Sequence, residues 1–276
     1  MFSLERTLQQ AKDLTERALV AYQNGVSSPK IYSNCNDEFL SIININSVEY
    51  RLVVMEYING KDFYSLGVLP NNEQLKKIAI EMAKLNSIEY KPTFIYDKWA
   101  IVNFIEEYNK NINLVDDEYK DYIHTAFKLF KTCDLQKLKH GFVHGDIIVT
   151  NVMKSQDEIY FIDFSVSNYL PRIVDLAVTI CDLCLDLDDL ESSKDRTKIF
   201  LDSYQRNKPL TEYEKECLII YLVCHQAITI LETTREKIIN HNDSLENEDF
   251  LNKGKKGIEI ILNDHKVIQV INKNIQ

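Results

Sequence analysis

The sequence predicts an α+β fold in which a small sheet-bearing lobe precedes a larger, mainly helical lobe. Short apolar runs separated by turn residues occupy positions 30–57, as in antiparallel strands. Most of the chain after residue 70 instead has the three-to-four-residue apolar spacing of helices. We therefore expect a partial N-terminal lobe at residues 1–60, with a hinge at 55–60, and a helical lobe at residues 61–276.

The composition excludes several classes of protein. With 276 residues, 45% of them apolar, the chain suits a globular fold. There is no run of about 18 apolar residues, so we expect no membrane partner. Residues 1–6 lack the long apolar core of a signal peptide. The net charge of −10 argues against a nucleic-acid partner and is compatible with a cationic small molecule.

The six cysteines do not form the framework of a disulfide-rich protein, because the chain is long and their spacing is irregular. Cys181 and Cys184 form a C-x-x-C pair, but on a helix two residues three apart simply share a face. No second Cys or His pair lies at zinc-ligand spacing. Buried thiols and a reducing cytoplasm are the natural interpretation.

The first lobe begins with a predicted helix over residues 4–23, with Ser3 as its N-cap and Gly25 as its stop signal. Its apolar positions recur at spacings of three and four: Leu4, Leu8, Ala11, Leu14, Ala18 and Tyr22. Strands are expected at 30–32, 38–44 and 48–57, with Asn46-Ser47 as the turn between the last two.

The second lobe is predicted to be a series of helices around a polar loop. One opens at residues 70–73 and carries the stripe Leu75, Ile78, Met82 and Leu85. Others are expected at 99–108, 118–130, 175–187 and 211–233. Residues 240–256 are polar and charged, which predicts a mobile connection, and the tail at 266–276 has little pattern.

The strongest chemical signal is the loop at 144–151, which has the pattern H-G-D-x₄-N, followed by the turn Ile162-Asp163-Phe164-Ser165. Phosphoryl transfer to a hydroxyl needs a carboxylate to accept the proton and oxygen ligands for Mg²⁺ on the nucleotide phosphates. Asp146, Asn151 and Asp163 supply that set. The alternative, a polar hairpin, gives no reason for a second carboxylate directly after the apolar run at 160–162.

These motifs resemble the catalytic loop and metal turn of protein kinases. Gly145 after the histidine resembles the small-molecule kinases of the aminoglycoside phosphotransferase and choline kinase superfamily. Residues 52–60 resemble its inter-lobe hinge, 81–87 its L-A-x-L-H-S helix, and 171–177 its P-x-x-x-D-L-A segment. The resemblance covers about residues 10–235, and weaker similarity at 200–211 points to the homoserine and hydroxylysine kinase branch. It implies a protein-kinase-like two-lobed fold.

The resemblance also implies roles for the loop residues. Asp146 would be the general base, and His144 would shape the catalytic loop through hydrogen bonds. Asn151 and Asp163 would ligate Mg²⁺. Asp175 would tie the catalytic loop to the helix that follows.

The cofactors implied are ATP and Mg²⁺, with the main chain at Glu56 and Ile58 bonding the adenine edge. An ordinary edge strand would leave the same sequence at 52–60, because backbone contacts leave little mark on side chains.

The sequence departs from the family pattern in its first lobe, which has no Gly-rich hairpin and no strand lysine before the first helix. Glu16 would be the helix carboxylate that normally pairs with that lysine. Lys12 lies within the helix and Lys30 follows it. This departure is typical of an N-terminally shortened form, of a rebuilt phosphate clamp, or of an impaired kinase. In the catalytic loop, Ile148 offers neither charge nor hydrogen bond.

Two functional hypotheses follow. The first is an ATP-dependent phosphotransferase that acts on a hydroxyl of an amino alcohol, hydroxy amino acid or aminoglycoside-like molecule. The second is a catalytically impaired kinase-fold protein that binds nucleotide or a partner. Acidic residues cluster on and after the helix that follows Asp175: Asp182, Asp186, Asp188, Asp189 and Glu191. They would attract a cationic acceptor, or they form an ordinary solvated helix face and helix end.

Overall fold

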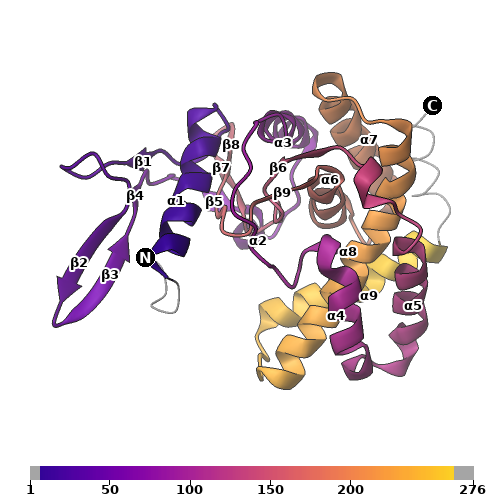
Figure 1. Cartoon of the computed structure of the whole chain (residues 1–276). Coiled ribbons are helices and arrows are strands. Elements are labelled where there is room, and N and C mark those ends of the chain that lie inside the picture. Colours follow the sequence, from indigo (N-terminus) through magenta and orange to yellow (C-terminus); the bar gives the residue numbers. More distant parts are fainter. Residues whose placement is uncertain (1–6, 264–276) are drawn as a thin grey trace.

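The computed structural model describes residues 7–263 and has the two-lobed arrangement that the sequence predicts. In Figure 1 the short strands of the first lobe lie to one side, the helices of the second lobe lie to the other, and α1 stands between them. The first lobe consists of α1 (Leu8–Gln23), β1 (Ile31–Tyr32), β2 (Ser41–Ile45), β3 (Val48–Leu52) and β4 (Val54–Met55).

Helix α1 begins at Leu8, not at residue 4, because a capping box closes its first turn. The Thr7 hydroxyl accepts from the Gln10 N–H, and the Gln10 side chain accepts from the Thr7 N–H. The predicted N-cap, Ser3, lies outside the described residues. The helix ends at Gln23, two residues before Gly25, whose φ of +77° is a conformation that glycine adopts without strain.

The strands of the first lobe form two separate antiparallel pairs. Strands β2 and β3 pair from Ser41↔Leu52 to Ile45↔Val48, and the turn lies at Asn46-Ser47 as predicted, with positive φ at both residues. The single strand expected over 48–57 is instead divided after Leu52, since β4 pairs with β1 and not with β2.

The second lobe contains two small sheets and most of the helices. Its elements are β5 (Lys61–Asp62), α2 (Phe63–Leu66), α3 (Asn72–Leu85), η1 (Ile101–Asn103), α4 (Phe104–Asn111), η2 (Ile112–Leu114), α5 (Asp117–Phe130), η3 (Leu135–Lys137), β6 (His140–Val143), β7 (Val152–Ser155), β8 (Glu158–Phe161), β9 (Asn168–Pro171), α6 (Ile173–Thr179), η4 (Ile180–Cys184), α7 (Leu190–Asn207), α8 (Glu212–Ile239) and α9 (Leu245–Asn263). One continuous apolar core runs through this lobe and reaches Ala21 and Val26 of the first.

The two sheets place both sequence motifs at strand ends. Strand β6 pairs with β9, from His140↔Pro171 to Val143↔Asn168, so the loop at 144–151 leaves a buried strand. Strand β7 pairs with β8 and β5, and the turn at 162–165 leaves β8. Phe142, Val152 and Phe161 are fully buried and fix these strands in the core.

Helix α8 is the central helix of the second lobe and contacts α4, α5, α6 and α9. A capping box between Thr211 and Glu214 starts it, and it extends to Ile239, beyond the predicted end at 233. An 18-residue window of α8 has a mean hydropathy of 1.5, enough by length and composition for a membrane span. Because 78% of that window is buried inside the fold, the pattern is also that of a core helix.

Two further elements, α9 and α7, differ from the sequence-based expectation. The stretch at 240–256 is not a mobile connection, because most of it forms α9, which packs along α8. Gly254 and Gly257 permit this close approach: a Cβ at Gly257 would lie 2.5 Å from the Gln226 amide. Helix α7 was not predicted; it packs on α3. The tail at 266–276 lies outside the described residues.

Candidate active site

The catalytic loop is anchored by Asp175, near the start of α6. Its Oδ1 accepts from the Gly145 N–H at 2.8 Å, and its Oδ2 accepts from the His144 N–H at 3.1 Å. The fully buried carboxylate therefore ties the loop to the helix, which confirms its expected structural role. Gly145 has a φ of +86°, which explains why a glycine follows the histidine.

His144 joins the catalytic loop to the strand before the metal turn. Its Nδ1 accepts from the Asp146 N–H at 3.3 Å, and its Nε2 lies 3.0 Å from the Ile162 carbonyl oxygen. This pair of contacts fixes the tautomer with the proton on Nε2. Burial lowers the pKa of His144 to about 4, so the ring is neutral. Its two hydrogen bonds hold the catalytic loop against the Ile162 backbone.

Asp146 and Asn151 are brought into direct contact. The Asn151 amide donates to the Asp146 carboxylate at 2.7 Å and to its carbonyl oxygen at 3.0 Å. The amide nitrogen is thus engaged within the loop, and the Asn151 side-chain oxygen takes no part in these two bonds. The Asn151 carbonyl oxygen accepts from the Ile162 N–H at 3.1 Å. This backbone hydrogen bond joins the end of the catalytic loop to the start of the turn at 162–165.

Asp163 adopts a left-handed conformation, with a φ of +61°, and accepts from the Ser165 N–H at 3.1 Å. Within residues 7–263, no group of three or more His, Cys, Asp or Glu side chains is arranged to hold a metal ion. Two hard oxygen donors, Asp163 and Asn151, do fit Mg²⁺, which commonly takes only one or two protein ligands and completes its shell with phosphates and water.

Asp146 lies in a strongly negative environment. Burial raises its pKa to about 7, and the charges of Asp97, Asp163 and Asp182 add to the shift, while the Asn151 hydrogen bond opposes it. A basic carboxylate is suited to accepting a hydroxyl proton. A cation bound nearby would offset the repulsion among these acids.

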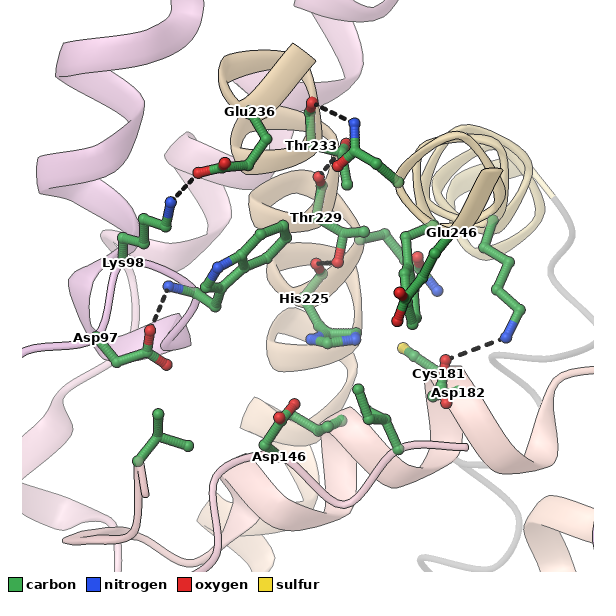
Figure 2. A pocket seen from close by; sticks show the side chains of 18 of the residues that line it. Asp97, Lys98, Asp146, Cys181, Asp182, His225, Thr229, Thr233, Glu236 and Glu246 are labelled. Carbon is green, nitrogen blue, oxygen red and sulfur yellow. Dashed lines mark hydrogen bonds and ion pairs between the residues drawn. The ribbon is translucent and has the colours of Figure 1, made fainter. Parts of the chain in front are cut away.

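A cavity of about 460 Å³ opens beside Asp146, a size typical of small-molecule sites. Figure 2 shows that Asp146 lies below α8, whose residues form one side of the cavity, while the segment at 97–99 forms the side opposite α9. Its acidic lining residues are Asp97, Asp146, Asp182, Glu236 and Glu246, and its basic ones are Lys98 and Lys253.

Both lysines of the cavity are paired with acids. Lys98 bonds Glu236, and Lys253 lies 3.2 Å from Asp182. Asp182 also accepts from the Val149 N–H at 2.6 Å, so it links the cavity to the catalytic loop.

The residues of the acidic run have different surroundings in the structure. Asp182 lines the cavity, whereas Asp186 accepts backbone N–H groups of its own loop and Asp189 caps α7.

A second cleft, of about 140 Å³, lies between the two lobes beside Asp163. Its lining includes Thr15 on α1, Ser28, and Val53 and Met55 near β4, but no lysine or arginine among the described residues. Glu16 is exposed and does not line it.

At the predicted hinge, the Glu56 N–H bonds the Lys30 carbonyl oxygen at 2.8 Å, and the Glu56 carboxylate accepts from the Lys30 N–H. The Ile58 carbonyl oxygen accepts from the Gly60 N–H at 2.9 Å. Within residues 7–263, the Glu56 carbonyl oxygen and the Ile58 N–H have no hydrogen-bond partner. The two groups are one acceptor and one donor, two residues apart, but neither residue is among those that line the cleft beside Asp163.

The sequence did not single out the residues that form most of the larger cavity. Asp97, Lys98 and Trp99 come from an irregular segment before η1, and His225 lies on one face of a long apolar helix. None belongs to a spaced motif. The one signal for His225 is that polar residues recur on α8 at 225, 229, 233 and 236, spacings of four and three that place them on one helix face.

The fold and the site together define a protein-kinase-like phosphotransferase scaffold. The sequence model described as the phosphotransferase enzyme family matches residues 1–197, so the chain belongs to this family. A homoserine kinase from Janthinobacterium sp. (strain Marseille) is 32% identical over 80 residues, which cover 29% of this chain and 25% of that protein. The chain spans about a quarter to a third of the length of the homoserine kinases that it matches.

Two other relatives align over most of the chain. A LicA homolog from Metamycoplasma hominis is 26% identical over 209 residues, 74% of this chain and 73% of that protein. The structure of a microcompartment-associated aminopropanol kinase superposes with a TM-score of 0.67 at 11% identity, covering 98% of this chain and 85% of the other. At that identity the superposition shows the shared fold alone.

Proposed function

We propose that this protein transfers the γ-phosphoryl group of ATP to a hydroxyl of a small, amine-bearing molecule. The observation that carries the proposal is the position of Asp146. This carboxylate lines the 460 Å³ cavity and, through Asn151 and the turn at Asp163, adjoins the second cleft. A base with an acceptor cavity on one side and oxygen ligands on the other is what transfer to a hydroxyl requires.

The chemistry assigned to the chain is positioning and proton transfer. Asp146 accepts the proton of the acceptor hydroxyl while that oxygen forms its bond to the γ-phosphorus. The bond from the phosphorus to the oxygen that bridges to ADP breaks, and the negative charge leaves on ADP. His144 and Asp175 keep the Asp146 backbone in place through their hydrogen bonds.

Asp163 and Asn151 would hold Mg²⁺, which neutralises phosphate charge during transfer. The Glu56 carbonyl oxygen and the Ile58 N–H would bind the adenine edge at the hinge. Structures that share the fold include an amicoumacin kinase with AMP-PNP and a spectinomycin phosphotransferase with AMP, which supports nucleotide as the common donor.

The class of acceptor follows from the charge of the cavity. Five acidic side chains and two lysines line it, and both lysines are already paired with acids. Such a surface favours a cation over an anion. Homoserine, aminopropanol and choline or ethanolamine are named for the kinases that this chain resembles, and each combines a hydroxyl with an amine or, in choline, a quaternary ammonium.

The test is ATP consumption with a panel of these acceptors, for the parent and for Asp146→Asn. We expect turnover with at least one acceptor and a loss of about 10²–10⁴ in kcat for Asp146→Asn, with nucleotide affinity retained. Cys35→Ser, at an exposed position, serves as the matched surface control. Equal turnover by parent and Asp146→Asn, with a contaminating kinase excluded, would remove Asp146 as the base.

One observation favours a second candidate, a nucleotide-binding protein with little kinase activity. No lysine or arginine lines the cleft beside Asp163 among residues 7–263, although kinases use a lysine to pair with the phosphates. This candidate predicts ADP binding without turnover of any acceptor on the panel.

A further inference from the structure

His225 is a polar group on the cavity wall whose ring has no hydrogen-bond partner among residues 7–263. It projects from α8, and in Figure 2 its ring is seen above Asp146 and to the left of Cys181 and Asp182, which line the same cavity. Its Nδ1 is shielded from solvent and makes no hydrogen bond within the described residues. The other ring nitrogen, Nε2, also makes no hydrogen bond within residues 7–263 and is not shielded from solvent, so it is the nitrogen that a group in the cavity reaches. A hydrogen-bonding group left without a partner when a ligand fills the cavity costs about 1–3 kcal/mol.

Neighbouring polar groups of the wall already have partners. The Thr229 hydroxyl donates to the His225 carbonyl oxygen at 2.8 Å, and the Thr233 hydroxyl donates to the Thr229 carbonyl oxygen at 2.6 Å. Asp182 is held by Val149 and Lys253. Close to Asp146, His225 therefore offers hydrogen bonding that the protein itself does not use.

The ring of His225 is neutral. Burial lowers its pKa to about 4; Asp182 acts to raise it and Lys253 acts to lower it further. A neutral imidazole has one lone pair that accepts an N–H and one N–H that donates. It can therefore contact an ammonium group without repelling it.

The aromatic rings of the cavity do not form a cage for a quaternary ammonium. Trp99 and Phe250 line the cavity, but Lys98 Nζ lies 5.8 Å from the Trp99 ring centroid and Lys253 Nζ lies 5.6 Å from that of Phe250. Quaternary ammonium groups are held by the faces of several aromatic rings. Here the chain's own ammonium groups lie over those two rings and would repel a third cation.

From these contacts we infer that His225 determines acceptor specificity by accepting a hydrogen bond from an ammonium N–H close to the reacting hydroxyl. The acceptor is then a primary or secondary amine, and trimethylated amines are rejected. This inference rests on the proposed function, since it assigns the acceptor to the same cavity.

The test measures binding by titration calorimetry, which needs no turnover. Two matched pairs serve as ligands: ethanolamine with choline, and L-homoserine with its N,N,N-trimethyl derivative. In each pair the two members differ by three methyl groups that replace the hydrogens on the ammonium nitrogen, and the His225 variants below separate the loss of hydrogen bonding from the added size. We expect the N–H member to bind at least about tenfold more tightly in one pair or both, because the trimethylated member leaves the His225 lone pair without a partner.

Three variants assign the effect to His225. His225→Leu should weaken binding of the N–H member by about 10–100-fold and change binding of the trimethylated member by less than about threefold. His225→Gln, which keeps an acceptor oxygen, should recover part of the loss. Thr125→Val is the control, because its hydroxyl bonds its own helix backbone and the residue does not line the cavity. If an acceptor is turned over, His225→Leu should raise KM and leave kcat nearly unchanged.

Equal binding of the two members of each pair, no detectable binding of any of the four ligands, or unchanged binding in His225→Leu would each overturn the inference. The proposed function is judged separately. Loss of activity on Asp146→Asn with no N–H preference would overturn the specificity role alone. An N–H preference without any phosphoryl transfer would overturn the kinase activity alone.

Discussion

The side-chain amide of Asn86 donates a 2.8 Å hydrogen bond to Oδ2 of Asp175, 89 positions further along the chain. The same amide bonds the Phe142 carbonyl oxygen at 3.2 Å, and its oxygen accepts from the Tyr204 hydroxyl at 2.9 Å. Asn86 at the end of α3, Asp175 on α6 and Tyr204 on α7 are thus joined by hydrogen bonds beside His144, where the catalytic loop begins. Asn86 stands where the family usually has histidine, and its amide supplies a donor and an acceptor at once.

Tyr204→Phe should destabilise the protein by about 1 kcal/mol, because it leaves the buried Asn86 oxygen without its donor. The chain offers a matched control in Tyr221, which is equally buried but whose hydroxyl has no partner in the described structure. Tyr221→Phe should be neutral or stabilising. Urea unfolding of both variants checks this, and an equal loss in both would contradict the hydrogen-bond assignment.

Asp175 should give the protein a distinctive pH dependence of stability. Burial raises its pKa to about 6, against the opposing hydrogen bonds from Gly145, Asn86 and His144. The native state then binds this proton more tightly than the unfolded state does, so stability falls as pH rises from about 4 to about 6. Asp175→Asn cannot ionise and should lack this component.

Denaturant unfolding at several pH values checks this prediction. The stability of the parent relative to Asp175→Asn should fall by about 2–3 kcal/mol between pH 4 and pH 6.5. Parallel curves for the two proteins would mean that the hydrogen bonds to the carboxylate balance its burial, and a parent that gains stability over this range would mean that they outweigh it.

Asp163 should carry the metal-dependent part of nucleotide binding. ATP with Mg²⁺ should raise the melting temperature of the parent, and Asp163→Ala should remove most of the rise, because a main oxygen ligand is gone. Asp157→Ala, at an exposed turn beyond β7, is the control carboxylate. A full rise in Asp163→Ala would place the metal elsewhere.

The hinge contacts should depend on backbone and not on side chains. Ile58→Pro deletes the N–H assigned to adenine and should weaken ADP binding, whereas Ile58→Val keeps the N–H and should not. Glu56→Gln should also leave affinity nearly intact. Calorimetry on folded variants decides this, and equal affinity for parent and Ile58→Pro would refute the hinge assignment.

Gly257→Ala should disturb the cavity through Gln226. A Cβ at this position would lie 2.5 Å from the Gln226 amide, which is buried and lines the cavity. We expect a loss of about 1–2 kcal/mol in stability and weaker acceptor binding, although alanine favours helix. Lys256→Ala, exposed on the same helix, should change neither; a Gly257→Ala protein like the parent would show that Gln226 moves freely.

The sequence predicted the fold well where spacing carried the information. The lobe order, the turn at Asn46-Ser47 and the anchoring role of Asp175 were all visible, because each depends on a local pattern or a short motif. The roles of Asp146, Asn151, Asp163, Glu56 and Ile58 stay predictions that the experiments above address.

The sequence did not predict helices α7 and α9, because both depend on packing against distant parts of the chain. Helix α9 contains Gly254 and Gly257, which are typical of loops, yet they are required where α9 lies against α8. Helix α7 has a weak apolar stripe and buries Arg196, whose guanidinium bonds the carbonyl oxygens of Leu183, Cys184 and Pro70. A buried arginine satisfied by backbone of distant segments leaves no periodic signal.

The cavity extends along helix α8, so its length is measured by the residues of α8 that line it. His225 lies on α8 near Asp146, and Glu236 lies on the same helix about 16 Å further along its axis at 1.5 Å per residue. A two-carbon amino alcohol held at Asp146 would contact only the first turn of this stretch. A longer acceptor would extend toward Lys98 and Glu236. Substitutions along this face of α8 would therefore select acceptors by length, while the hydroxyl that reacts stays at Asp146.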